Sequence, residues 1–347
     1  MTETPFVYRM RYALPEPAPL VSIVIPTKDH VETLDACVMS IAQKATYANY
    51  EIVLVENNSE APETFAYYET LPERVAAASE GKGVARVVYW PGEFNYSQII
   101  NFGVEHAKGD YLLLNNDAEV ISPDFIEEMM GYLQRPDAGV VGAKLCFADH
   151  LVQHAGILVG VRGALAHANQ DFSAKREGYL ARAVRPGNFS AVTGACQMVR
   201  RDVFEQVGGY NEEFAVGFND ADFCLRVWEA GYRTIFTPYA ELYHYEFTLR
   251  GREEADEEKM RRWKREQALF MQRWPEFFLD GDRGSDRTYP LGASISHFRE
   301  SGCRCMVWLA ICLIIIMWQI CSVIAVKWVI TSLIKLRHAC PACYLAN

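Results

Sequence analysis

Short apolar runs alternate with amphipathic segments along the first half of the chain. Four runs contain the apolar and β-branched residues that strands favour, at residues 21–26, 50–57, 85–91 and 110–117. Between them, apolar residues recur at helical spacing at 29–45, from Glu63 onward and at 95–109. Continuous apolar strands that alternate with helices are typical of a parallel sheet covered on both faces. The pattern therefore predicts an α/β fold.

Local signals place the ends of two of these helices. Asp29 is the expected N-terminal cap of the helix at 29–45, because its carboxylate can accept a hydrogen bond from the first turn. Gly109 is the expected stop of the helix at 95–109, because glycine is favoured just after a helix.

The pattern changes after residue 120. Glycine interrupts the predicted strands at 138–147 and 154–167, and the following elements mix strands with helices. The second half is therefore predicted to be a mixed extension of the first sheet. Its remaining elements are a helix at 123–136, a strand, short helix and Gly-Gly turn at 190–210, a helix at 220–232 leading into a strand at 233–244, and a long helix at 252–274.

Composition supports a folded, cytosolic protein. The chain has 347 residues, of which 50% are hydrophobic and 22% charged, and this length suggests about two domains. Its net charge of −10 argues against a nucleic-acid partner held through phosphate contacts. Residues 1–20 contain no apolar core of a secretory signal, and the sparse cysteines before residue 290 are typical of a reducing compartment.

The C-terminal part differs in kind. Residues 306–326 carry no formal charge, and as a helix they would be roughly 31 Å long, about the thickness of a bilayer's hydrocarbon core. This segment is therefore predicted to be a transmembrane helix. The composition break after about residue 285 is also consistent with an altered reading frame.

Polar clusters follow three predicted strands, at residues 26–30, 56–60 and 115–119. Each cluster alone is typical of a turn, because Asn and Asp bond to their own backbone. Together, at the carboxyl edge of a parallel sheet, they predict a crevice for a base, a ribose and a metal-bound diphosphate. The glycine-rich dinucleotide and phosphate loops are absent from the sequence, as are GxSxG and HExxH.

Six longer strings occur in order along the chain: "VSIVIPTKD", "YEIVLVENNS", "FNYSQIINFGVEHAKGDYLLLNNDAEV", "TGACQMVRRDVFEQVGGYNEEF", "FNDADFCLRVWEAGYR" and "TPYAELYHYE". As a set they resemble family 2 glycosyltransferases of the GT-A fold, especially the bacterial polysaccharide branch that includes rhamnosyltransferases. The resemblance covers roughly residues 20–250 and implies a GT-A nucleotide-diphospho-sugar transferase domain at 20–285. A leader at 1–19, a linker at 286–304, a hydrophobic helix at 305–334 and a tail at 335–347 would surround it.

The resemblance implies which residues bind the nucleotide sugar. Glu56 would hold the base or the ribose, and Asn115 would replace the first Asp of the family's Asp-x-Asp motif. The other residues implied to border the nucleotide-sugar site are Pro26, Thr27, Asp29, Asn57, Ser59, Asn95, Asn101 and Asn116.

The resemblance also implies the metal ligands and the base. Asp117 would bind Mg²⁺ or Mn²⁺, cations that prefer oxygen ligands, and His244 would complete the metal shell. Asp220 would remove the proton from the acceptor hydroxyl, with Asp222 as the second candidate. A structural alternative stays open, because Asn219 or Asp220 can cap the helix and Asp222 can pair with Arg226.

The expected chemistry is a single in-line displacement at the anomeric carbon, with inversion. The donor would be a dTDP- or UDP-sugar and the acceptor a cell-surface polysaccharide or a lipid-linked glycan, at the cytoplasmic face of the inner membrane. Without a genuine anchor the protein would be cytoplasmic. A nucleotide-sugar-binding module with weak catalysis remains an alternative, whereas a nucleotidyltransferase would need a glycine- and lysine-rich loop that "PTKDH" does not supply.

Overall fold

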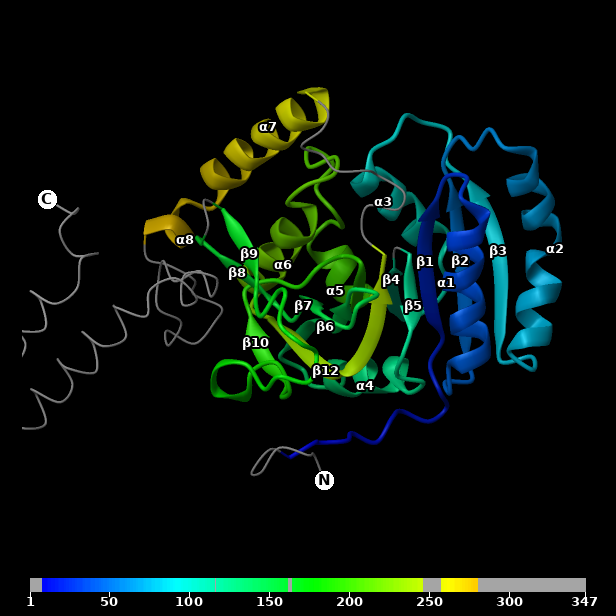
Figure 1. The fold of residues 1–347 in the computed structure, drawn as a ribbon, viewed down its shortest axis with the longest axis horizontal. Helices are drawn as coiled ribbons and strands as arrows, with labels where there is room; N and C mark the ends of the chain where they lie inside the picture. The colour runs from blue at the N-terminus through cyan, green and yellow to red at the C-terminus, as the bar shows by residue number, and fades with distance from the viewer. Residues whose placement is uncertain (1–7, 116, 162–163, 246–256, 280–347) are drawn as a thin grey trace, which may run out of the picture. The chain divides into compact units, whose positions relative to one another are not determined.

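The computed structural model describes residues 8–115, 117–161, 164–245 and 257–279. The chain divides into two units, Met1–Gly292 and Ala293–Asn347, and all described residues belong to the first. That unit is built on one ten-stranded sheet (Figure 1). Eight of its strands have the order β10-β12-β6-β11-β4-β1-β2-β3, while β5 pairs with β12 and β7 pairs with β6. These strands are β1 (Val21–Thr27), β2 (Tyr50–Glu56), β3 (Gly83–Tyr89), β4 (Tyr111–Asn115), β5 (Ala118–Val120), β6 (Ala138–Cys146), β7 (Val152–His154), β10 (Gly187–Phe189), β11 (Cys196–Arg200) and β12 (Arg233–His244).

The sheet is mostly parallel, as the sequence predicted. Strands β3, β2, β1 and β4 are parallel neighbours, and β6 and β12 run in the same direction. Strand β11 lies antiparallel between β4 and β6, and β10 is antiparallel to β12. A separate hairpin joins β8 (Ile157–Val159) to β9 (Leu165–His167). The mixed second half is therefore confirmed as an extension of the first sheet.

Helices cover both faces of the sheet because its strands are apolar on both sides. In β1, Ile23 and Ile25 pack in the core on the side of α1, whereas Val24 packs on the side of α3. One face carries α1 (Val31–Lys44), α2 (Pro62–Ala78) and α4 (Phe125–Leu133). The other carries α3 (Tyr96–His106), α5 (Arg201–Gln206), α6 (Asn219–Glu229), α7 (Glu257–Arg273) and α8 (Pro275–Leu279), and a short 3-10 turn spans Tyr179–Ala181.

Both predicted helix-end signals are wrong. Helix α1 begins after His30, which has a left-handed backbone and no capping side chain. The Asp29 carboxylate instead accepts hydrogen bonds from the N–H groups of Glu60 and Ala61, so it holds the backbone just before α2. Burial opposes ionisation of Asp29, but the N–H donors of Ala61 and Glu60 outweigh it and lower its pKa below the usual value.

Helix α3 ends at His106, three residues before Gly109. A Cβ atom at Gly109 would lie 2.5 Å from the carbonyl oxygen of Leu20 and 2.7 Å from the nitrogen of Ser22. The glycine is therefore required by the close approach of β1 rather than by the end of the helix.

The predicted hydrophobic helix at 305–334 lies outside the described residues, as do the predicted divisions at 285, 304 and 334. Among the residues that the structure does describe, no helix has both the length and the apolar character needed to cross a membrane.

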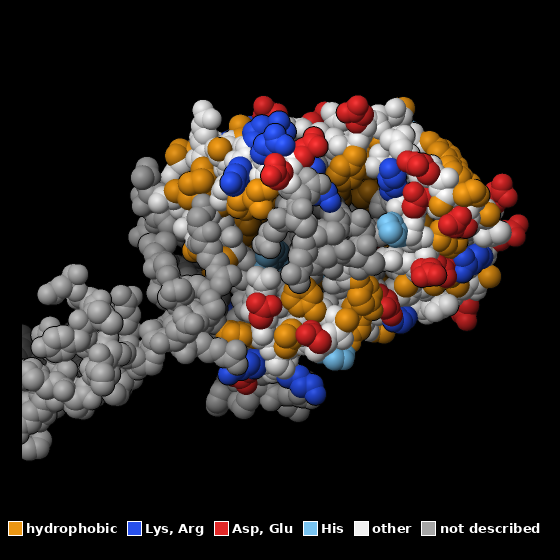
Figure 2. Space-filling model, turned by 45° about the horizontal axis from the view of Figure 1, so that its top comes forward, with side chains coloured by type: hydrophobic (Ala, Val, Ile, Leu, Met, Phe, Trp, Pro, Cys, Tyr) orange, Lys and Arg blue, Asp and Glu red, His pale blue; other side chains and the backbone are white. Residues whose placement is uncertain are grey.

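Acidic side chains account for much of the exposed surface near α2. Figure 2 shows Asp and Glu side chains gathered along the right-hand side of the molecule, where α2 lies. The exposed acids of this region include Glu63, Glu69, Glu73 and Glu80. Such a surface repels phosphate backbones.

A buried carboxylate joins three strands and the loop after α3. Glu51 is 3% exposed and accepts hydrogen bonds from the Ser22 hydroxyl (2.6 Å) and the Lys108 N–H (2.6 Å). It also pairs with Arg86 at 2.9 Å. Burial alone would raise the pKa of Glu51, but these donors and the guanidinium lower it below the ordinary value.

We predict that Glu51→Gln lowers the free energy of unfolding by about 1–3 kcal/mol at pH 7, because the amide cannot pair with Arg86. A depressed folded pKa means that the carboxylate stabilises the fold above its unfolded pKa, and that this contribution is lost as the pH falls through the folded pKa. Urea titrations between pH 7 and pH 3 should therefore show the two proteins converging in acid. A difference that is independent of pH would contradict this interpretation.

Candidate active site

The loops after β1 and β2 are joined by hydrogen bonds centred on Ser59. The Ser59 hydroxyl accepts from the Asp29 N–H (2.9 Å) and donates to the Glu56 carboxylate (2.6 Å). Glu56 also accepts from the Tyr68 hydroxyl (2.6 Å) and is 3% exposed. The structure therefore places Glu56 beneath the loop, where it holds Ser59, rather than on the surface of the loop.

Pro26 and Thr27 end β1 and pair with Val55 and Glu56 of β2. The Asn57 N–H donates to the Thr27 carbonyl (2.9 Å), which continues the ladder beyond the strands. The predicted nucleotide residues of these two strands are thus brought together at one edge of the sheet.

The end of β4 presents two side chains in different environments. Asn115 is fully buried and its amide donates to the sulfur of Cys37 on α1 (3.6 Å), while its Oδ1 has no hydrogen-bond partner. Asp117 has a left-handed backbone (φ 54°) and is 8% exposed. Asn115 therefore faces the interior beneath α1, and Asp117 is the carboxylate at this strand end. Asn116 lies outside the described residues.

His244 is brought beside Asp117 by strand register. Strand β5 pairs with β12 so that His244 lies opposite Ala118, the residue after Asp117. The Gln153 side-chain oxygen lies 2.7 Å from His244 Nδ1. Because that oxygen can only accept, His244 Nδ1 carries a proton, and in the neutral ring Nε2 is then the nitrogen with the lone pair.

Asp220 lies near the start of α6, and its side chain accepts hydrogen bonds from two backbone N–H groups. One carboxylate oxygen accepts from the Gly194 N–H (3.0 Å) and the other from the Ala221 N–H (2.7 Å). The side chain of Asn219 accepts in turn from the Asp220 N–H (2.7 Å). The carboxylate is thus partly exposed and fixed in orientation at the positive end of a helix.

Asp222 has a different environment from Asp220. It is fully buried and pairs with Arg226 (2.8 Å) and Arg273 (3.0 Å), and it accepts from the Trp274 indole N–H (3.0 Å). The predicted pairing with Arg226 is confirmed. Because its two oxygens are engaged inside the protein, Asp222 joins α6 to the end of α7.

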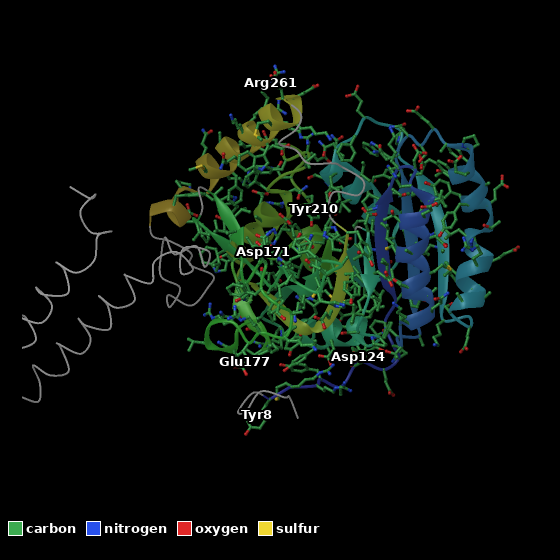
Figure 3. All side chains as sticks on the ribbon, in the orientation of Figure 1. Tyr8, Asp124, Asp171, Glu177, Tyr210 and Arg261 are labelled. Carbon is green, nitrogen blue, oxygen red and sulfur yellow. The ribbon has the colours of Figure 1, made fainter. Side chains whose placement is uncertain are left out.

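Asn95 and Asn101 also have partners within the protein. Asn95 caps α3, and its amide donates to the carbonyl of Glu212 (2.9 Å). The Asn101 amide donates to the Tyr210 carbonyl (2.9 Å) and accepts from the Tyr210 N–H (2.9 Å). Both side chains hold the segment that precedes α6. Tyr210 itself lies in the interior, 1% exposed (Figure 3).

Strand register connects the two groups of candidates. Strand β11 runs antiparallel to β4 with Cys196 opposite Asn115. Gly194, which binds Asp220, lies two residues before Cys196, and Asp117 lies two residues after Asn115. Asp117 and the turn that binds Asp220 therefore lie at the same end of the β4–β11 pair.

Comparison with known sequences identifies the family. A family model described as glycosyl transferase family 2 matches residues 22–208. That match covers more than half of the chain and includes β1, β2, β4 and β11. The chain belongs to glycosyl transferase family 2.

Two relatives of this family 2 chain are much longer proteins, and a third is of similar length. The chain is 40% identical over 272 residues to the uncharacterized protein y4gI of Sinorhizobium fredii, covering 78% of this chain and 29% of that protein. It is 37% identical to the O-antigen biosynthesis protein RfbC of Myxococcus xanthus, covering 71% and 19% respectively. It is 28% identical to the N-acetylglucosaminyl-diphospho-decaprenol L-rhamnosyltransferase of Mycobacterium tuberculosis, covering 42% and 50%. The chain thus spans less than a third of the first two.

Solved structures share the fold of this family 2 domain. GalNAc-T7, solved with UDP, GalNAc and Mn²⁺, aligns with a TM-score of 0.56 at 15% identity, covering 78% of this chain and 53% of that one. The mannosyltransferase PcManGT of Pyrobaculum calidifontis, solved with GDP-Man and Mn²⁺, aligns with a TM-score of 0.52 at 15% identity, covering 95% and 84%. The predicted GT-A fold is confirmed.

Sequence patterns did not single out several residues that support the site in this family 2 domain. Glu266, 1% exposed on α7, accepts from the N–H groups of Ala215 and Gly217 just before α6. Its sequence context is an ordinary amphipathic helix, which carries no signal of a contact about 50 residues away. Gln153 and His154 lie at the start of a predicted strand that glycines interrupt. The sequence signal available there was a pair of histidines, His154 and His167, at the two ends of the segment 154–167.

We predict that Asp222→Asn destabilises the domain by about 3 kcal/mol or more, because it removes one partner of a buried ion pair and leaves Arg226 buried without it. Urea unfolding followed by circular dichroism measures the change. Asp202→Asn is the matched control, since that carboxylate pairs with Arg200 but is 69% exposed. Equal effects of the two substitutions would contradict the structural role of Asp222.

Proposed function

We propose that this chain transfers a sugar, with inversion, from a nucleotide-diphosphate sugar to a hydroxyl of a cell-surface polysaccharide or lipid-linked glycan. The observation that carries the proposal is the strand register, in which Asp117, His244 and the turn that holds Asp220 all follow from the same end of the β4–β11 pair. Family membership supports glycosyl transfer, and the names of the O-antigen protein and the rhamnosyltransferase support an envelope glycan as the acceptor.

The residues at the end of β4 fit a divalent cation. Among the described residues there is no group of three or more His, Cys, Asp or Glu side chains that could hold a metal. Mg²⁺ and Mn²⁺ sites of this kind need one or two protein ligands, because substrate phosphates complete the shell. Asp117 and the Nε2 atom of His244 supply that number, and Gln153 orients the imidazole by accepting a hydrogen bond from its Nδ1. Both relatives in the structural comparison were solved with Mn²⁺.

The buried Asn115 changes the role expected from the family motif. Its side chain lies against Cys37 and has no exposed surface, so we assign it to the support of the strand end rather than to the metal shell. An asparagine there adds no second charge beside Asp117.

Asp220 is the proposed general base. The Gly194 and Ala221 N–H groups each hold one carboxylate oxygen, and each oxygen keeps a further lone pair that can accept a proton. The acceptor hydroxyl loses its proton to Asp220 as its oxygen bonds to the anomeric carbon, and the bond from that carbon to the diphosphate oxygen breaks. Attack from the face opposite the leaving group inverts the configuration. A bound divalent cation would neutralise charge on the departing nucleoside diphosphate.

The donor and the location complete the proposal. The wall formed by the loops after β1 and β2 is assigned to the nucleotide, with dTDP-rhamnose and UDP-hexoses as the first candidates. We assign the domain to the cytoplasmic face of the inner membrane, where residues 306–326 would anchor it. Sedimentation of the full chain with membranes, compared with a chain truncated at residue 285, tests the anchor.

We predict that Asp117→Ala abolishes both turnover and the Mn²⁺-dependent rise in melting temperature caused by the donor, because a ligand that binds the folded state stabilises it. The assay is a thermal-shift panel of dTDP-rhamnose and UDP-hexoses with and without Mn²⁺. Asp110→Ala, at the other end of the same strand, is the control and should behave like the parent protein. Full activity of Asp117→Ala would overturn the metal assignment.

We predict that Asp220→Asn keeps donor binding and loses turnover by about 10²–10⁴-fold, because the amide cannot accept the proton. Nucleoside diphosphate release is measured in the presence of N-acetylglucosaminyl-diphospho-polyprenol as a test acceptor. Glu229→Gln, at the exposed end of α6, is the matched control. Unchanged turnover in Asp220→Asn would reject it as the base, and donor binding without turnover in the parent protein would favour a binding module.

A further inference from the structure

A fully buried histidine at the end of β7 has hydrogen-bonding neighbours on both sides of its ring. His154 Nδ1 lies 2.8 Å from Nδ1 of His167, the last residue of β9. Its Nε2 receives the N–H groups of Gly156 (3.3 Å) and Thr193 (3.4 Å). The ring packs edge-on against Phe236, whose centroid is 6.4 Å away.

These contacts fix the tautomer of His154. A backbone N–H can only donate, so Nε2 must be the acceptor and Nδ1 must carry the proton. Nδ1 therefore donates to His167, which accepts at its own Nδ1. Burial and the neighbouring His167 and His244 lower the pKa of His154 well below its usual value, which agrees with a neutral ring.

Consecutive backbone groups connect His154 to the proposed base. Thr193, whose N–H binds His154, is followed by Gly194, whose N–H binds the Asp220 carboxylate. The turn is tightly packed, because a Cβ atom on Gly194 would lie 3.0 Å from the Tyr210 hydroxyl and 3.5 Å from Asp220 Cβ. A shift of this turn would therefore move the donor that orients Asp220.

The same short strand also contacts the proposed metal ligand. Gln153, the residue before His154, accepts from His244 Nδ1 at 2.7 Å. On strand β7, His154 thus contacts the turn that holds Asp220, and Gln153 contacts the imidazole of His244. These two neighbouring residues connect the proposed base with the proposed metal ligand.

We propose that His154, oriented by His167, is a positioning residue for sugar transfer. It holds the Thr193–Gly194 turn, and this turn sets the direction of the Asp220 carboxylate relative to Asp117 and His244. The inference rests on the proposed function, because it assigns Asp220 as the group that His154 serves.

Two substitutions separate the roles of the two ring nitrogens. Glutamine at position 154 places an amide oxygen near the position of Nε2 and keeps an acceptor for the Thr193 N–H. Asparagine places an amide N–H near the position of Nδ1 and keeps a donor for His167, but it has no acceptor at the Nε2 position. His154→Asn should lower kcat by about 10- to 100-fold, the size expected when a catalytic group is misplaced. His154→Gln should stay within about threefold of the parent, and KM for the donor should be unchanged in both.

The measurements use the full chain, with Mn²⁺ and the panel of dTDP-rhamnose and UDP-hexoses. Turnover is followed as nucleoside diphosphate release, and hydrogen exchange is followed by mass spectrometry for the peptide that contains Thr193 and Gly194. Exchange of this peptide should be faster in His154→Asn than in His154→Gln. Phe189→Leu is the packing control, because Phe189 contacts Phe236 in the same aromatic cluster without bonding to the turn. It should lower the melting temperature and leave kcat and exchange of the peptide unchanged.

The outcomes distinguish the inference from the proposed function. Equal kcat losses in the Gln, Asn and Phe189→Leu proteins would overturn the inference, since loss of packing would then explain them. Unchanged exchange of the Thr193–Gly194 peptide in His154→Asn would also overturn it, with or without turnover. If the parent protein releases no nucleoside diphosphate, or Asp220→Asn is fully active, the proposed function fails even where the exchange result holds.

Discussion

The pairing of β4 with β1 on one side and β11 on the other is the constraint on which the site depends. The parallel pair β1–β4 brings the end of β4 to the same edge as the loops after β1 and β2. The antiparallel pair β4–β11 brings the start of β11 to that edge as well, and with it the turn that contacts Asp220. The antiparallel strand β11 therefore brings the turn that holds Asp220, the proposed base, to the same edge of the sheet as the proposed nucleotide and metal residues.

The second half of the domain holds α6 in place by contacts distant in sequence. Helix α7 lies beyond the residues matched by the family model, yet its Glu266 holds the backbone just before α6. Phe270 packs against Phe214 and Phe218 in the same segment. The indole of Trp274 reaches Asp222 from the residue between α7 and α8. These contacts fix the direction of the helix that carries Asp220. A buried carboxylate or indole N–H that lost its partner would find no water in the core to replace it, so the hydrogen bonds must be kept.

Sequence reasoning succeeded where the signal was local or strongly periodic. The apolar runs predicted the strands β1, β2 and β4 to within two residues, and the i,i+4 spacing predicted the pair of Asp222 with Arg226. It failed where a side chain could form a hydrogen bond either with a residue close in sequence or with one far along the chain. Asp29 looked like a cap for the next helix, but its carboxylate bonds to the loop after the neighbouring strand β2, about 30 residues later. The burial of Asn115 against Cys37 and the partner of Gln153 depend on register and packing, which no single segment encodes.

In the proposed mechanism, a divalent cation and the nucleoside diphosphate meet at the end of β4. Anomalous diffraction at the manganese edge, from crystals of the full chain grown with Mn²⁺ and UDP or dTDP, tests it directly. We predict one peak bonded to the Asp117 carboxylate and to Nε2 of His244, with the nucleotide lying along the loops after β1 and β2. A manganese peak remote from both side chains beside a bound nucleotide, or a nucleotide bound away from these loops, would contradict it.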